Sequence, residues 1–133
     1  MRTAVITRTT RETDITLTLT LDGSGKTSLS TGIGFFDHML DALCRFGQLD
    51  LALTCRGDLH VDAHHTVEDV GICLGRAIRD ALGDRAGIRR AASAYMPMDE
   101  ALAFAALDIS GRPYLVFDAE FAAPMCGQFD TQL

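Results

Sequence analysis

Apolar and polar residues alternate strictly along residues 13–21 (TDITLTLTL), which is the two-residue period of a strand with one buried face. Residues 3–8 (TAVITR) and 50–55 (DLALTC) have the same strand-like character. Residues 22–25 (DGSG) favour a tight turn, so we expect residues 26–30 to return as the hairpin partner of the alternating strand. This part of the chain therefore predicts a four-stranded sheet.

Two longer segments carry apolar residues at helical spacing. Residues 34–46 place apolar side chains on one face and precede Gly47, a residue type that favours helix ends. Residues 62–82 predict a longer helix with Asp62 as its N-cap. The expected buried stripe of this second helix consists of Val67, Val70, Leu74, Ala77, Ile78 and Leu82.

A short motif occurs twice in the chain. LDGSGK at residues 21–26 is echoed by LDISGR at residues 107–112, and each copy follows an apolar strand-like run. After the second copy we expect a further short strand at residues 114–117. With 133 residues, 47% of them hydrophobic, and no low-complexity run, the chain is expected to form a single domain over residues 1–133. The duplication divides this domain into a first repeat at 1–92 and an incomplete second repeat at 93–133.

The predicted fold class is α+β, with tandem units that each have a four-stranded sheet and two helices on one face. The second unit is truncated after its leading strands, because no helical segment follows LDISGR. We therefore expect the natural chain to continue past Leu133 and the 133-residue chain alone to be inactive. The uncovered face of the second unit would be an exposed apolar patch.

Charge and cysteine content limit the function classes. The chain has 18 acidic and 12 basic residues, a net charge of −6, which disfavours nucleic acid or an anionic membrane as an electrostatic partner. A phosphate ligand would need a few well-placed cations. The four cysteines form no CxxC pair and no zinc-like spacing, so we expect reduced thiols in a cytoplasmic protein.

The segment 58–71 (DLHVDAHHTVEDVG) holds the most specific candidate chemistry, an HHxxE group. In a helix, His64 and Glu68 share a face, as do His65 and Glu68, whereas the two adjacent histidines diverge by roughly 100°. They are therefore expected to serve different metal ions. A structural role is the alternative for each histidine, and from residue type alone it is favoured for His38 and His60.

Seven ordered motifs make the chain resemble the imidazoleglycerol-phosphate dehydratase family along essentially its whole length. The motifs are RET (11–13), TGIGFFDHML (31–40), GDLH (57–60), HHTVED (64–69), ALGD (81–84), PMDE (97–100) and LDISGRP (107–113). The resemblance implies a hydro-lyase of histidine biosynthesis that converts imidazoleglycerol phosphate to imidazoleacetol phosphate. It also implies two Mn²⁺ ions per active site, and trimers that assemble into an octahedral 24-mer.

Site roles follow from the resemblance position by position. The metal ligands it implies are His38, His64, His65 and Glu68, and it places Glu12 as the acid/base. The implied phosphate-binding residues are Arg90 and Arg112, with Asp99 and Glu100 near the same cleft. Without the resemblance, Glu12, Arg90 and Arg112 would be taken as solvated charges or turn residues.

Three positions depart from the family pattern, namely Ala42, Phe46 and Ala63. The first two are expected to weaken binding of the substrate phosphate. Ala63 removes a possible hydrogen-bond acceptor for a metal-bound imidazole. Two other functions remain open. One is a metal-binding, non-catalytic remnant; the other is a hydrolytic metalloenzyme, whose HxxEH motif needs a histidine where this chain has Asp69.

Overall fold

The structure is a computed structural model that describes residues 1–133. It divides into two compact units: unit 1 comprises Met1–Gly83 with Phe121–Leu133, and unit 2 comprises Asp84–Glu120. The elements of unit 1 are β1 (Thr3–Thr9), β2 (Thr13–Thr20), β3 (Thr27–Ser30), α1 (Gly34–Gly47), β4 (Asp50–Gly57), α2 (His64–Leu82), β7 (Met125–Cys126) and β8 (Phe129–Asp130). Unit 2 contains β5 (Ala91–Met98) and β6 (Ala101–Asp108).

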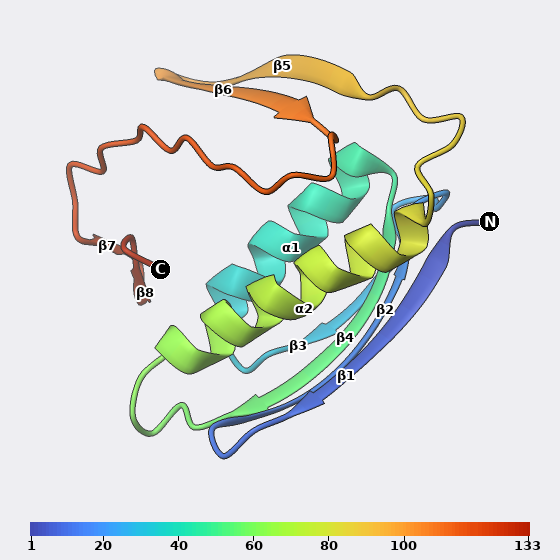
Figure 1. The fold of residues 1–133 in the computed structure, drawn as a ribbon. Coiled ribbons are helices and arrows are strands. Elements are labelled where there is room, and N and C mark those ends of the chain that lie inside the picture. Colours follow the sequence, from blue (N-terminus) through green and yellow to red (C-terminus); the bar gives the residue numbers. More distant parts are fainter. The chain divides into compact units, whose positions relative to one another are not determined.

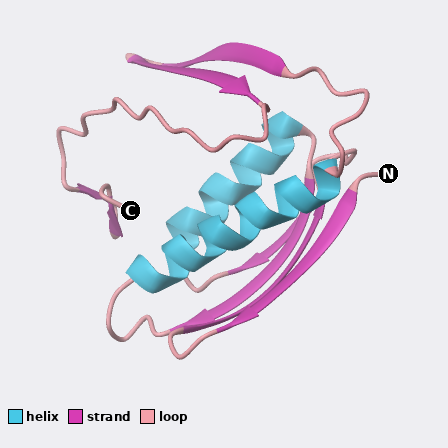
Figure 2. Ribbon diagram, in the orientation of Figure 1, coloured by secondary structure: helices cyan, strands magenta, loops and turns pink.

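Unit 1 is built on a four-stranded sheet in the order β1-β2-β4-β3. The β1–β2 and β2–β4 pairs are antiparallel, whereas β3 runs parallel to β4. Both long helices cover the same face of this sheet (Figures 1 and 2). The predicted α+β class, with two helices on one face of a four-stranded sheet, is confirmed.

The core follows from the alternating pattern. Leu17 and Leu19 of β2 are 0% exposed, and they lie among Leu51 and Leu53 of β4. The interleaved threonines of β2 point to the opposite, more accessible face. Burial of a leucine side chain contributes roughly 1.5–3 kcal/mol, so this face holds the two helices on the sheet.

The predicted hairpin of residues 26–30 with the alternating strand is wrong. β3 pairs only with β4, and the second partner of β2 is β4 itself. The cause lies in the preceding turn, where the amides of Ser24 and Lys26 donate to Asp50 Oδ1 at 2.7 and 2.9 Å. Asp50 is the first residue of β4, so these bonds attach the turn to β4. The residues that follow the turn therefore pair with the outer edge of β4 and not with β2.

The predicted strand at residues 114–117 is also wrong, since no strand forms there. In unit 1 the corresponding strand, β3, is held by its parallel partner β4. Unit 2 contains only the antiparallel β5–β6 hairpin, so residues 114–117 have no neighbouring strand to bind.

The long helix begins two residues later than predicted. Ala63 is the N-cap of α2, and the Asp62 side chain accepts a bond from the His64 amide at 2.8 Å instead of capping from the N-cap position. The stripe facing the sheet is also shifted. Val70 and Ala77 are buried as expected, but Thr66, Asp69, Cys73 and Ala81 are buried with them, while Val67, Leu74, Ile78 and Leu82 are half-buried.

The two copies of the repeated motif share backbone and side-chain features. Gly25 and Gly111, equivalent in LDGSGK and LDISGR, have φ of 82° and 85°, a region that glycine enters without steric cost. Asp22 binds Arg2 with an N···O distance of 2.6 Å, and Asp108 binds Arg90 at the same distance. Unit 2 therefore repeats the opening hairpin of unit 1. The predicted boundary between residues 92 and 93 stays a prediction.

No helix in the structure is both long enough and apolar enough to cross a membrane.

Candidate functional site

The first turns of α2 carry the HHxxE group. His64 Nε2 lies 3.2 Å from Glu68 Oε2, one helical turn away. Both side chains are more than half exposed, at 62% and 58%. The pair therefore presents an imidazole nitrogen and a carboxylate toward the same accessible region.

His65 points to a different partner. Its Nδ1 lies 2.9 Å from Oδ2 and 3.2 Å from Oδ1 of Asp58, in the loop between β4 and α2. The hydrogen bond to Asp58 raises the pKa of His65 above its ordinary value, and the charges of Glu12 and Asp62 act in the same direction. The two adjacent histidines thus face different surroundings, as their helical geometry predicts.

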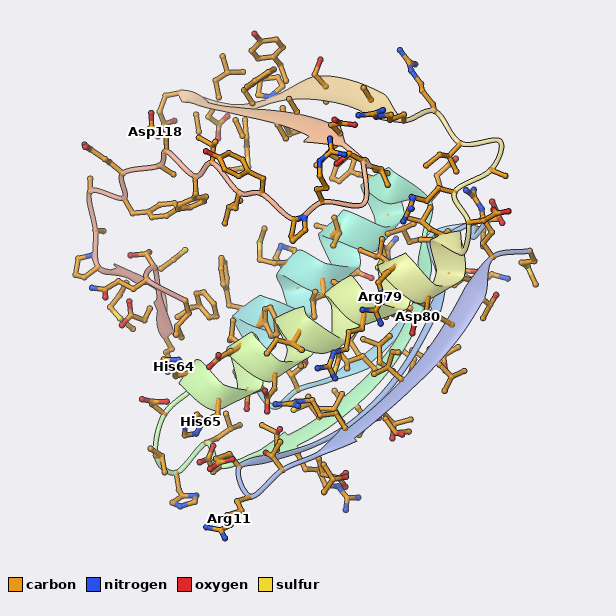
Figure 3. The ribbon with its side chains drawn as sticks, in the orientation of Figure 1. Arg11, His64, His65, Arg79, Asp80 and Asp118 are labelled. Carbon is orange, nitrogen blue, oxygen red and sulfur yellow. The ribbon has the colours of Figure 1, made fainter.

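Glu12 lies in the turn that joins β1 to β2. Its amide donates to Thr10 Oγ1 at 3.1 Å, and its carbonyl oxygen accepts from the Asp58 amide at 3.0 Å. Figure 3 shows Arg11, the preceding residue of this turn, at the same end of unit 1 as His64 and His65. The turn, the β4–α2 loop and the start of α2 therefore meet at one place.

A groove of about 750 Å³ adjoins the His64–Glu68 pair. Apolar side chains of the two helices line it, together with residues of the C-terminal segment 121–133, and Leu133 is among them. Phe129 of this segment packs against Phe35 and Phe36, with ring centroids 5.1 and 6.4 Å apart. A ligand bound at the His64–Glu68 pair would therefore also contact apolar side chains of this groove.

The structure does not bring the remaining histidines to this group. His38 is exposed on α1. His60 is exposed in the β4–α2 loop. Within residues 1–133, no three His, Cys, Asp or Glu side chains are arranged to hold a metal ion.

The donors that are present nevertheless fit a manganese site in part. Imidazole and carboxylate together suit divalent first-row metals such as manganese, and no thiolate is needed. His64 with Glu68 would offer two donors to one ion, and His65 would offer one donor to a second. Further ligands would be needed for each ion.

Unit 2 holds the predicted phosphate residues. Arg90 donates from Nε and Nη2 to the two oxygens of Asp108, at 2.6 and 3.0 Å. This hydrogen bonding lowers the pKa of Asp108, and the charge of Arg112 contributes. Arg90 and Arg112 thus gather at the open end of the β5–β6 hairpin, whereas Asp99 and Glu100 form its turn at the other end.

Comparison with known proteins identifies the family. A family model described as imidazoleglycerol-phosphate dehydratase matches residues 31–133. The chain belongs to the imidazoleglycerol-phosphate dehydratase family. The family name describes dehydratases, so the chain belongs among enzymes of that type, as the motifs predicted.

Relatives of this dehydratase family match the whole chain. The imidazoleglycerol-phosphate dehydratase of Acidiphilium cryptum is 65% identical over 132 residues, which are 99% of this chain and 67% of the relative. That of Ruminiclostridium cellulolyticum is 56% identical over 133 residues, which are 100% of this chain and 69% of the relative. The chain thus spans about two thirds of the length of these two curated relatives.

Solved imidazoleglycerol-phosphate dehydratases have the same fold. The crystal structure from Staphylococcus aureus matches with a TM-score of 0.86 and 34% identity, covering 98% of this chain and 71% of that one. The crystal structure from Pyrococcus furiosus matches with a TM-score of 0.73 and 38% identity, covering 86% and 60%.

Two carboxylates at this site were missed by the sequence reasoning. Asp58 binds the His65 ring, although the loss of a carboxylate at Ala63 suggested that an acceptor for a metal-bound imidazole was missing. In the sequence, Asp69 is notable only as the residue that replaces the last histidine of HxxEH. Asp58 could have been noted because it lies in the GDLH motif, but its distance from His65 depends on the path of the loop.

Asp69 binds the start of α2 to the β1–β2 hairpin. Its Oδ1 accepts from Arg8 Nη2 of β1 at 2.9 Å, and its Oδ2 accepts from the Thr13 hydroxyl of β2. Burial alone would raise the pKa of Asp69, but the hydrogen bonds from Thr13 and Arg8 outweigh this effect and the pKa is lowered. The carboxylate therefore stays ionised and stabilises the fold at neutral pH.

Asp69→Ala should lower the free energy of unfolding by about 1–3 kcal/mol at pH 7, because it leaves the partners of a buried carboxylate unsatisfied. A depressed pKa stabilises the fold above the unfolded value near 3.9 and ceases to do so as pH falls through the native value. The difference from wild type should therefore shrink below about pH 4. Urea titrations across pH measure it.

Asp80→Ala is the matched control, since Asp80 of α2 also pairs with an arginine, its neighbour Arg79, but both side chains are exposed (Figure 3). Its unfolding free energy should stay near that of wild type. Equal effects of the two substitutions would contradict the role assigned to Asp69.

Proposed function

We propose that this protein dehydrates imidazoleglycerol phosphate to imidazoleacetol phosphate in histidine biosynthesis, as a manganese-dependent hydro-lyase. Family membership and the names of its relatives support the reaction. The structural observation that carries the proposal is the divergence of His64 and His65 beside the turn that bears Glu12. We further propose a cytoplasmic homo-oligomer of trimers that form a 24-mer.

In this proposal, His64 and Glu68 hold one manganese ion and His65 holds a second. His38 of α1 is apart from this group within one chain, so in the proposed oligomer it would join the ligands from a neighbouring subunit, and other ligands would complete each coordination sphere. When bound, manganese supplies Lewis-acid stabilisation to the imidazole ring of the substrate. Such help is needed because the carbon that loses its proton has no adjacent carbonyl group.

Glu12 is the proposed acid/base that moves protons at the substrate carbons. Its turn is fixed on both sides, through the Thr10 hydroxyl and the Asp58 amide. The carbonyl oxygen of Glu12 accepts from the amide of Asp58, whose side chain binds the His65 ring, so this turn adjoins a proposed ligand. A general acid/base needs this proximity to the reacting atoms.

Arg90 and Arg112 are proposed to bind the substrate phosphate. The Arg90 guanidinium has five N–H donors, and Nε and Nη2 already donate to Asp108. Nη1 is therefore available for a phosphate oxygen while Asp108 fixes the plane of the group. Binding energy from this remote phosphate would position the reacting carbon. Asp99 and Glu100 lie at the opposite end of the hairpin, and their proposed place near the substrate has less support than that of the two arginines.

A second candidate is a metal-binding but non-catalytic protein. It would bind metal through the HHxxE donors alone, because no three His, Cys, Asp or Glu side chains within residues 1–133 are arranged to hold a metal ion. Assaying the full-length gene product for loss of water from imidazoleglycerol phosphate, with and without Mn²⁺, separates the two functions. Manganese binding without any turnover would leave only the second candidate.

His64→Ala and Glu68→Ala should each lower both bound manganese and turnover, because each removes a proposed metal ligand. Elemental analysis of the purified full-length variants and a dehydratase assay measure the two quantities. His60→Ala is the matched control, an exposed histidine of the adjoining loop, and should retain both. Wild-type manganese content in the His64 and Glu68 variants would remove them from the ligand set.

Glu12→Gln should reduce turnover on the order of a hundredfold or more, the usual contribution of general acid–base catalysis. Manganese content should not change, because no metal ligand is lost. Arg112→Ala should act mainly on apparent substrate affinity. Steady-state kinetics with elemental analysis of both variants distinguish these effects. Normal turnover in Glu12→Gln would exclude Glu12 as the acid/base.

A further inference from the structure

We infer that Asp58 is a positioning residue that holds Nδ1–H of His65 and so presents Nε2 as the ring nitrogen that binds metal. The inference rests on the proposed metal role of His65. Its structural basis is the contact of Nδ1 with both oxygens of the Asp58 carboxylate, at 2.9 and 3.2 Å.

The direction of the hydrogen bond follows from the chemistry of the two groups. A carboxylate has only acceptor oxygens, so the facing ring nitrogen must carry the proton. In neutral imidazole the other nitrogen, Nε2, then has the lone pair that a metal ligand requires. His64 lacks this arrangement, since its carboxylate neighbour Glu68 faces Nε2 itself. The two adjacent histidines are therefore held differently.

Asp58 is itself fixed by its backbone. Its amide donates to the Glu12 carbonyl at 3.0 Å, and its carbonyl accepts from the Val61 amide at 2.8 Å. One residue thus contacts the proposed acid/base through its main chain and a proposed metal ligand through its side chain. The Asp58 side chain is only 17% exposed, against 42% for His65, so the contact is shielded on the carboxylate side.

Gly57 allows this approach. A Cβ at residue 57 would overlap the side-chain hydroxyl of Thr66, the residue that follows His65 in α2. Only glycine lets the end of β4 pass so close to the helix. The path of the backbone therefore places Asp58, the next residue, beside the His65 ring.

The ring tautomer can be measured in the metal-free full-length protein by long-range ¹H–¹⁵N NMR of the histidine side chains. Above the pKa of His65, wild type should show the proton on Nδ1. Asp58→Ala should lose this preference and bind Mn²⁺ about 10- to 100-fold more weakly, the usual effect of removing such a partner. Asp58→Asn keeps an acceptor oxygen, so it should retain the tautomer and bind Mn²⁺ more tightly than Asp58→Ala.

Asp62→Ala is the matched control. Asp62 lies in the same loop, but it accepts from the His64 amide and does not touch the His65 ring. Its removal should leave the His65 tautomer unchanged. A merely structural role for Asp58 would alter folding stability without this selective change in tautomer.

A wild-type His65 with its proton on Nε2 would overturn the inference, and so would an Asp58→Ala protein with unchanged tautomer and manganese affinity. If Asp58→Ala does not fold, the wild-type tautomer and the Asp58→Asn variant still decide the matter. A wild-type protein that binds manganese and shows the Nδ1 proton, yet does not dehydrate the substrate, would refute the proposed function while supporting the role of Asp58.

Discussion

Asp69 of α2 accepts hydrogen bonds from Arg8 of β1 and Thr13 of β2, and it is almost wholly buried. A buried charge is costly unless partners satisfy it. The apolar face of α2 would allow the helix to slide along the sheet, because hydrophobic contact is not directional. The carboxylate requires partners at defined positions, so it fixes where the helix begins relative to the β1–β2 turn.

The candidate site depends on this fixed position of α2 on the sheet. With the start of α2 fixed, His65 meets Asp58 and the turn holding Glu12 is bound to the same loop. Gly57 permits the close approach of β4 to the helix. The groups proposed for metal binding and proton transfer are therefore positioned by backbone contacts in three segments, which suits a reaction that depends on accurate placement.

Much of the fold could be predicted, because buried apolar residues recur at the spacing typical of a strand or a helix. The alternation in β2 and the helical spacing in α1 and α2 gave the right elements. The pairing of β3 could not be predicted, because it depends on Asp50 binding the turn after β2. The motifs indicated the family and the HHxxE geometry. Asp58 and Asp69, by contrast, act through contacts between segments that are distant in the sequence, and a local sequence pattern does not reveal such contacts. The predicted site residues themselves stay predictions.

In the proposed site, the start of α2 directs His64 and His65 to two different metal ions. Anomalous diffraction at the manganese edge, from crystals of the full-length protein loaded with Mn²⁺, locates those ions. Two separate anomalous peaks are expected, one bonded to His64 and Glu68 and the other to Nε2 of His65. A single peak shared by both histidines, or no peak at either, would contradict it.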